Sequence, residues 1–317
     1  MPHFGSVDSY AALHPELGCF KITPKWSLCD PLIISFVTNA FQSSYELLPM
    51  PQFFSLYGYF FVDKFPFGKP GRLDGNGDPL EAFRDTYIEN LDSRVPNQAY
   101  LRTAFDFHNQ IGSKIDTSGK VFVLTEMRIP TVRSLTKTWK PVFFPGGPLH
   151  WSLDFAPGDG RVLAGVGGAL EPSNNTELHN YYLFTDVKHG GMLNDDRIAT
   201  VVRSILEGQT WDPEWAKWGI YRELHSSPFS YSRFEMQSSA SFHLYDSEER
   251  HTGFIGDGII ETAPGTQYLV LGDSIVAAAL NDDEYRIEII PNGSSLFGVG
   301  SGVVWSHTTM RGRRLWS

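Results

Sequence analysis

The chain has 317 residues, 41% of them hydrophobic, and a formal net charge of −10 from 26 basic and 36 acidic side chains. This size and composition predict a globular protein of about two domains, and the acidic balance without a long Lys/Arg cluster argues against nucleic-acid binding. No stretch approaches the roughly 18 consecutive apolar residues of a transmembrane helix. The first residues also lack the charged and apolar regions of a signal peptide, which points to the cytoplasm if Met1 is the true start.

Hydrophobic periodicity predicts an α/β region in the first two-thirds of the chain. Residues 97–115 carry apolar side chains at three- and four-residue steps, which predicts an amphipathic helix. A second amphipathic helix is expected at residues 192–207, where Gly208 ends it. Strands are expected in four short apolar runs, at 120–125, 141–144, 151–155 and 178–186. Strands that alternate with helices are typical of a layered α/β sheet.

The character of the chain changes after Gly208. Residues 209–237 contain three tryptophans and are predicted to be a linker or docking segment, with domain packing, membrane contact and substrate contact as alternatives for these rings. Residues 238–317 are predicted to form a small all-β, sandwich-like module. Its expected strands are short runs of alternating character at 240–245, 266–271, 274–278 and 285–290.

Two motifs carry candidate chemistry. Asp159 lies in the glycine turn Gly158-Asp159-Gly160, and His189 follows 30 residues later on a loop before the second predicted helix. Acyl transfer through a serine needs a hydroxyl, a histidine that takes its proton and a carboxylate that holds the histidine tautomer. In α/β-hydrolases the acid and then the histidine follow the nucleophile in the chain. The sequence therefore predicts Asp159 as the acid and His189 as the base of a catalytic triad.

The nucleophile elbow Gly-x-Ser-x-Gly is missing from the sequence. Three segments combine glycine and serine, at 272–274, 293–295 and 300–302. The first two lack the glycine that should follow the serine by two residues, and the third has its glycines directly beside the serine. All three lie downstream of the predicted base. Cys19 and Cys29 have no elbow context, and a disulfide and two reduced thiols are alternatives for them. We therefore expect this chain alone to be inactive in serine-dependent hydrolysis.

Four motifs in order resemble the C-terminal part of the lecithin:cholesterol acyltransferase-like lipases and acyltransferases, which are α/β-hydrolases. Residues 1–6, Met-Pro-His-Phe-Gly-Ser, resemble the Thr-Pro-His-x-Gly-Ser stretch of that family, and residues 42–49 resemble its Pro-Ser-x-x-x-Leu-Leu-Pro segment. Residues 158–162, Gly-Asp-Gly-Arg-Val, stand where the family has Gly-Asp-Gly-Thr-Val, and residues 189–193 resemble its histidine motif. The resemblance covers residues 1–208.

The resemblance implies a partial α/β-hydrolase sheet with a cap segment over residues 1–208, ahead of the β module. It implies that Asp159 and His189 are the triad acid and base, that the substrate is a lipid or another acyl ester, and that the full-length protein is secreted or extracellular. The nucleophile would then lie upstream of Met1. No cofactor or metal is expected.

Two functional hypotheses follow from these motifs. In the first, the chain is a fragment of a serine-dependent lipid ester hydrolase or O-acyltransferase, and the serine comes from an upstream segment or from a partner chain. In the second, the chain is a non-catalytic binding protein, with a relic hydrolase scaffold and a β module that binds a ligand.

Overall fold

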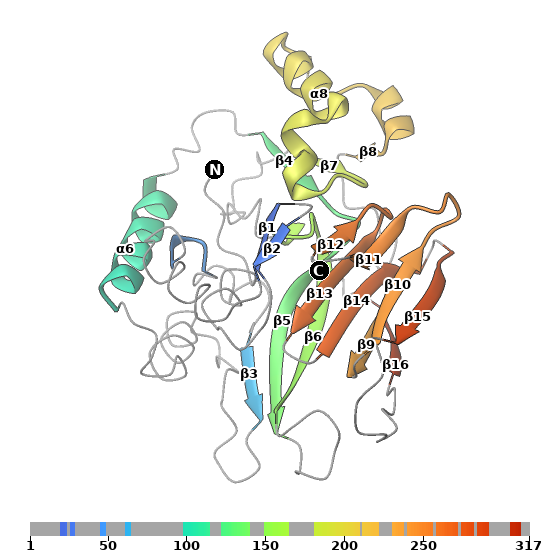
Figure 1. Ribbon diagram of the computed structural model, residues 1–317. Helices are drawn as coiled ribbons and strands as arrows, with labels where there is room; N and C mark the ends of the chain where they lie inside the picture. The colour runs from blue at the N-terminus through green and yellow to red at the C-terminus, as the bar shows by residue number, and fades with distance from the viewer. Residues whose placement is uncertain are drawn as a thin grey trace, which may run out of the picture.

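The protein is described here from a computed structural model. The residues that the structure describes are 20–23, 26–28, 45–48, 61–64, 98–114, 122–139, 149–164, 181–209, 211–221, 230–237, 240–255, 258–271, 274–281, 284–291 and 305–311. Cys19, Cys29, the predicted strand at 141–144 and the first two resemblance motifs lie outside these residues, apart from 45–48. The described part is dominated by strands in small, mostly antiparallel sheets (Figure 1).

Two four-stranded antiparallel sheets form the C-terminal part. One has the order β12 (Gly258–Glu261), β11 (His251–Ile255), β10 (Ala240–Tyr245) and β15 (Arg286–Pro291). The other has the order β13 (Thr266–Leu271), β14 (Ser274–Leu280), β9 (Ser230–Gln237) and β16 (Trp305–Arg311). β10 and β13 have the bounds predicted from the sequence. β9 lies within the predicted linker, yet it pairs with β14 on one side and β16 on the other.

A shared hydrophobic core joins these two sheets. Side chains alternate across a strand, so Phe242 and Leu244 of β10 point to the same face, where they meet Tyr268 of β13 and Ala277 of β14. Met236 of β9 is buried in the same cluster. The core explains why the sequence shows short strands with one apolar face in this region.

A long hairpin lies against the outer face of β9. It consists of β5 (Ile129–Trp139) and β6 (Leu149–Gly158), and β3 (Phe61–Lys64) pairs parallel to β5. Tyr231 of β9 donates its hydroxyl hydrogen to Asp154 Oδ1 at 2.9 Å and accepts from the Phe155 backbone N–H at 3.0 Å. Arg233 donates to the Leu153 carbonyl oxygen at 2.5 Å. These bonds fix the hairpin that ends in the Asp159 turn.

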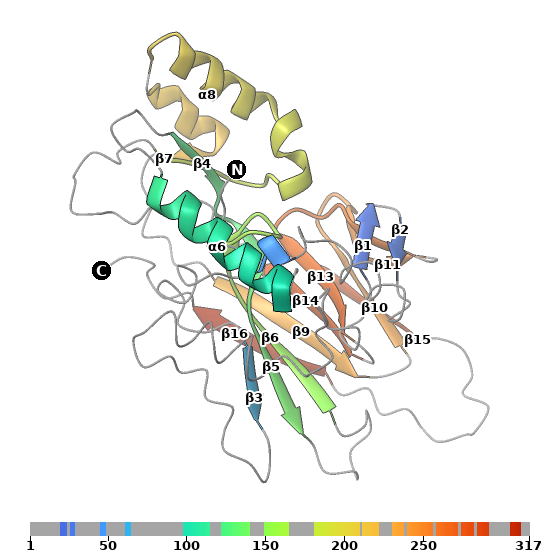
Figure 2. The ribbon, with the colours of Figure 1, turned by 90° about the vertical axis from the view of Figure 1, so that its left-hand side faces the viewer.

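A third unit combines a three-stranded sheet with helices at one end of the molecule (Figures 1 and 2). β4 (Val123–Glu126) runs parallel to β7 (Tyr181–Phe184), and β8 (Ile220–Tyr221) runs antiparallel to β7. The helical elements are the 3₁₀ helix η3 (His189–Asn194), α8 (Asp196–Leu206) and the 3₁₀ helix η4 (Pro213–Trp218). Trp215 is buried in their core with Phe184 and Val201, so this tryptophan packs within the fold.

The remaining described elements are α6 (Gln98–Lys114) and the small hairpin of β1 (Phe20–Thr23) and β2 (Trp26–Leu28). α6 lies within one residue of the predicted bounds at each end. Its Ala104 and His108 are buried, and His108 Nε2 donates to the Glu46 carbonyl oxygen at 2.6 Å. Within the described residues, no helix has the length and apolar character needed to cross a membrane.

The predicted partial α/β-hydrolase sheet is wrong. Between the described strands, parallel pairing is limited to β3 with β5 and β4 with β7, apart from an isolated parallel bridge between Ile129 and Asp159. Each of these three-stranded sheets also contains an antiparallel strand. The apolar runs at 120–125 and 178–186 do include strands, as predicted. Their hydrophobic pattern does not specify their neighbours, however, and the β5–β6 hairpin between them forms a separate sheet.

Candidate acid–base site

The Asp159 side chain is held by its own turn. Its Oδ1 accepts hydrogen bonds from the Arg161 N–H at 2.9 Å and from the Val162 N–H at 2.7 Å. The Asp159 backbone N–H in turn donates to the Val162 carbonyl oxygen at 3.1 Å. This arrangement is an Asx-type turn, in which a short carboxylate satisfies the backbone donors ahead of it. One carboxylate oxygen is therefore occupied by the turn, and the other can meet a second partner.

The two glycines of the motif are required by the geometry of this turn. Gly160 has a φ of 89°, in the left-handed region that L side chains rarely adopt. A Cβ at Gly158 would overlap the carbonyl oxygen of Val162 and the side chain of Thr131. Thr131 Oγ1 also accepts the Gly160 N–H at 2.8 Å, which ties the turn to β5.

His189 meets the free oxygen of this carboxylate. The imidazole Nδ1 lies 2.7 Å from Asp159 Oδ2, and the His189 backbone N–H donates to the Asp159 carbonyl oxygen at 2.9 Å. The structure thus brings together the two residues that the sequence singled out, through both side chain and backbone. The side chain of Asp159 is 9% exposed and that of His189 is 51% exposed, so the pair lies at the surface with its acid shielded.

The chemistry of the pair follows from the partner of Nδ1. An ionised carboxylate only accepts hydrogen bonds, so the Nδ1 of His189 carries the proton between them. The lone pair of the neutral imidazole then resides on Nε2, on the other side of the ring from Asp159. This is the arrangement in which a histidine can take a proton from a hydroxyl while the carboxylate stabilises the resulting imidazolium.

Glu126 is a second carboxyl group near this pair, and the sequence analysis missed it. It ends β4, is fully buried, and accepts hydrogen bonds from the backbone N–H groups of Arg128, Asp186 and Val187. Burial raises the pKa of Glu126 to about 8. A glutamate directly after an apolar strand is the signal that could have identified it, because charged side chains are rarely buried without partners.

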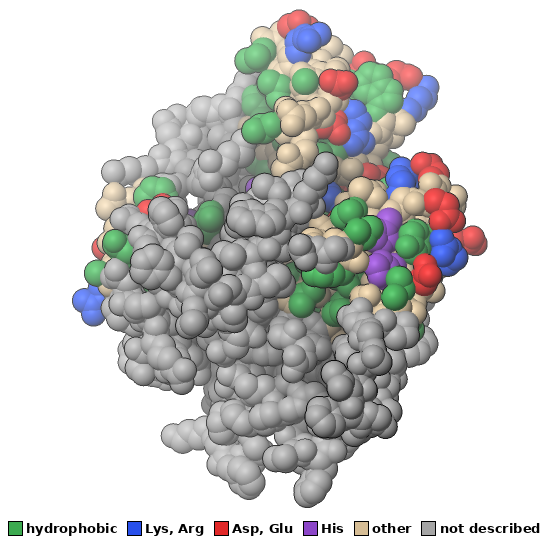
Figure 3. Space-filling model, in the orientation of Figure 1, with side chains coloured by type: hydrophobic (Ala, Val, Ile, Leu, Met, Phe, Trp, Pro, Cys, Tyr) green, Lys and Arg blue, Asp and Glu red, His purple; other side chains and the backbone are tan. Residues whose placement is uncertain are grey.

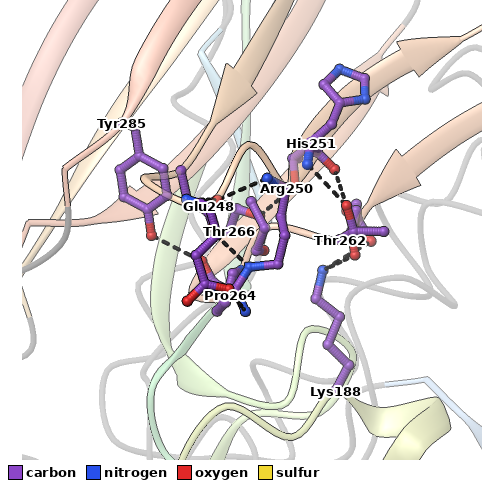
Figure 4. A network of polar contacts seen from close by, with 12 residues as sticks. Lys188, Glu248, Arg250, His251, Thr262, Pro264, Thr266 and Tyr285 are labelled. Carbon is purple, nitrogen blue, oxygen red and sulfur yellow. Dashed lines mark hydrogen bonds and ion pairs between the residues drawn. The ribbon is translucent and has the colours of Figure 1, made fainter.

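The β sheets also contact both motifs of the site. Lys188, the residue before His189, donates from Nζ to the Glu261 carbonyl oxygen at 2.8 Å, and its Nζ lies 3.9 Å from Glu261 Oε2. Figure 4 shows Lys188 reaching from its loop toward the strand end that carries Thr262. A Cβ at Gly160 would lie 3.0 Å from Gln267 Oε1 of β13. The region predicted as an accessory module is therefore in contact with the candidate site.

None of the three serines weighed as a nucleophile is a described part of this site. Ser274 begins β14, where its backbone pairs with Leu271 and Gln237, while Ser295 and Ser301 lie outside the described residues. In the part of the chain that the structure describes, no group of three or more His, Cys, Asp or Glu side chains is placed to hold a metal ion.

In comparisons with known proteins, no family model matches the chain and no curated protein matches its sequence. The resemblance to the lecithin:cholesterol acyltransferase-like enzymes therefore rests on the sequence motifs alone. The geometry of Asp159 and His189 is what indicates chemistry at this site.

Proposed function

We propose that Asp159 and His189 are the acid and base of a serine-dependent lipid ester hydrolase or O-acyltransferase. The observation that carries the proposal is the 2.7 Å contact between His189 Nδ1 and Asp159 Oδ2, with the other carboxylate oxygen held by two backbone N–H groups. His189 would accept the serine proton during attack on the ester carbonyl. It would then return that proton to the leaving alcohol, and the cycle would repeat with water or an alcohol as the acyl acceptor.

The proposal does not depend on the predicted sheet. The same acid–base–nucleophile geometry recurs on unrelated folds, so a triad is recognised by the roles and distances of its members. The serine would be supplied from outside these 317 residues, by an upstream segment of the same polypeptide or by a partner chain.

Exposed apolar side chains in the helical elements that begin at His189 support a lipid as the acyl-bearing substrate. Leu193, four residues after His189 in η3, is 97% exposed, and Leu206 at the end of α8 is 83% exposed. Figure 3 shows hydrophobic side chains at the surface of this part of the molecule. Exposed apolar clusters often mark contacts with apolar partners, and an acyl chain is such a partner.

The test uses the genomic DNA before the Met1 codon. We expect an in-frame Gly-x-Ser-x-Gly sequence there, and we expect the longer protein to hydrolyse p-nitrophenyl butyrate or transfer its acyl group. His189→Ala in the longer protein should lower kcat about 10⁴-fold, whereas the 317-residue chain alone should show no turnover. A stop codon and ribosome-binding site directly before Met1, with no partner chain that restores activity, would favour the non-catalytic binding protein instead.

A further inference from the structure

Glu126 connects two segments that are far apart in the chain. Its Oε1 accepts from the Arg128 N–H at 2.8 Å and from the Asp186 N–H at 3.1 Å, while its Oε2 accepts from the Val187 N–H at 3.1 Å. The last two donors belong to the segment between β7 and His189. A side chain at the end of β4 therefore holds the backbone that leads into the candidate base.

The segment it holds has an unusual backbone. Asp186 has a φ of 64°, in the left-handed region, which costs a non-glycine residue roughly 1 kcal/mol. Successive N–H groups around such a residue converge and form a concave site for an anion or another acceptor. Here the carboxyl group of Glu126 occupies that site.

The segment is anchored at both of its ends. Glu126 holds the N–H groups of Asp186 and Val187, and two residues later the His189 N–H donates to the Asp159 carbonyl oxygen. Any rotation of the Asp186–Val187 peptide would move His189 relative to the carboxylate it contacts. The position of the imidazole therefore depends on the acceptor at the end of β4.

Water cannot replace this acceptor, because Glu126 is fully buried. The pKa of Glu126 is raised to about 8, chiefly by burial and in smaller part by the Asp186 charge, while the three backbone hydrogen bonds partly oppose the rise. The charged groups facing it are Asp186 and Arg197. Both oxygens of a carboxyl group can accept an N–H whether or not the group is protonated, whereas the amide of a glutamine has only one accepting atom.

We propose that Glu126 is a positioning residue, which acts by holding the Asp186–Val187 backbone so that His189 can meet Asp159. This inference deepens the proposed function and rests on it for its catalytic meaning. Its structural content, a dependence of the histidine contact on the glutamate, can be measured without any turnover.

The experiment compares Glu126→Gln with Glu235→Gln in the 317-residue chain. Glu235 is a matched control, since it is also a buried carboxyl in a strand but its side chain pairs with Arg233 of β9. Amide hydrogen exchange and ¹⁵N-edited NMR of the histidine rings report on the loop and on the Nδ1–H bond. In Glu126→Gln we expect exchange at Asp186, Val187 and His189 to accelerate at least about 10-fold, and the hydrogen-bonded Nδ1–H signal of His189 to be lost.

Two control variants set the native and the lost Nδ1–H signal against which Glu126→Gln is compared. Glu235→Gln should keep the native signal, and Asp159→Asn should lose it. A folded Glu126→Gln protein with native exchange rates and a native Nδ1–H signal would overturn the inference while leaving the acyl-transfer proposal standing. Conversely, absence of acyl transfer in the longer protein would count against the proposed function and leave these measurements unchanged.

A second variant covers the case in which Glu126→Gln does not give the native circular dichroism spectrum. Glu126→Asp keeps both acceptor oxygens on a side chain shorter by one methylene, so they no longer reach all three donors. We expect intermediate acceleration at Asp186 and Val187, with exchange in β14 unchanged. Native exchange rates at these two amides in the aspartate variant would also overturn the inference.

Discussion

Two histidine sites in the described part of the molecule, one at His189 and one at His243, differ in what the ring nitrogen faces. At the first, His189 Nδ1 meets the Asp159 carboxylate, and half of the histidine side chain is exposed. At the second, His243 Nδ1 lies 2.7 Å from His251 Nε2, and both side chains are buried. The first site has a charged acceptor that can stabilise an imidazolium, and the second has another base.

The second site extends along one face of the β10–β11 pair. Ser241 Oγ lies 3.2 Å from His243 Nε2, and the two imidazole planes differ by only 16°. Because the two facing ring nitrogens lie within hydrogen-bond distance, one ring must donate and the other accept. Within the described residues, His251 Nδ1 is buried without a hydrogen-bond partner. A positive charge on this pair would have no carboxylate bonded to it.

Burial therefore has opposite functional meanings at the two sites. Desolvation lowers the pKa of His243, and it lowers the pKa of His251 with a further contribution from the neighbouring ring. Such a pair resists protonation and serves as a neutral structural link between strands. The Asp159–His189 pair, in contrast, shields only its acid and exposes its base, which is what proton transfer to a substrate requires.

Both sites depend on a glycine, and substitution of these glycines gives the largest expected loss of stability. In Gly158→Ala the new methyl group would overlap backbone at Val162, which cannot move without opening the Asp159 turn, so we expect a loss of about 3 kcal/mol. In Gly253→Ala the methyl group would lie 2.8 Å from His251 Nε2 and 2.9 Å from His243 Nδ1, where the rings can shift, so we expect about 1–2 kcal/mol.

Urea denaturation of both variants measures these losses. Gly190→Ala is the matched control, because a Cβ at that position meets no atom within 4 Å and should change stability little. Equal losses in the Gly158 and Gly253 variants would contradict the distinction between a backbone and a side-chain obstacle.

The next largest effect is the response of the buried histidine pair to acid. A histidine whose folded pKa is lowered contributes stability that is complete above its unfolded value of 6.5 and is lost as the pH falls through the folded pKa. The facing carboxylate of Glu288 opposes this shift only in part. We expect the native chain to lose stability between about pH 7 and about pH 5, and His251→Phe to lose less.

Comparing the native chain with His251→Phe cancels the contribution of Glu126 to the pH dependence of stability, which has the opposite sign. Glu126 has a folded pKa raised from 4.5 to about 8, so its contribution is complete below 4.5 and is lost as the pH rises through 8. Both proteins contain Glu126, so the difference between their urea midpoints at about pH 5 and about pH 7 isolates the histidine pair. Identical pH dependence of the two proteins would show that the pair does not resist protonation.

The sequence predicted those features that depend on local pattern. The period of apolar side chains located α6, β10 and β13, and the glycines around Asp159 indicated a tight turn from residue type alone. The contact of Asp159 with His189 was anticipated from the order and spacing of two motifs, which resemble those of a family of enzymes.

The features that depend on distant neighbours were not predictable in the same way. β9 lacks the apolar run of a central strand because its outer face carries Tyr231, Arg233 and Glu235 against the β5–β6 hairpin. The His243–His251 pair requires the register of β10 on β11, which no periodicity reveals. The partial α/β-hydrolase sheet failed for the same reason, because strand neighbours were inferred from analogy rather than from the residues.

The smallest predicted effect concerns the contact that joins the two regions. Lys188 and Glu261 are 33% and 12% exposed, and the Lys188 Nζ also donates to a backbone carbonyl, so Lys188→Ala should cost about 0.5–1 kcal/mol. Lys217 and Glu214 form a closer ion pair, at 2.6 Å, but they are 70% and 62% exposed. Solvent screens such a pair, so Lys217→Ala should change the urea midpoint less than Lys188→Ala despite the shorter distance. If the Lys217 variant loses as much stability as the Lys188 variant, burial does not decide the strength of these contacts. The link from the β sheets to the His189 loop would then contribute no more than a surface ion pair.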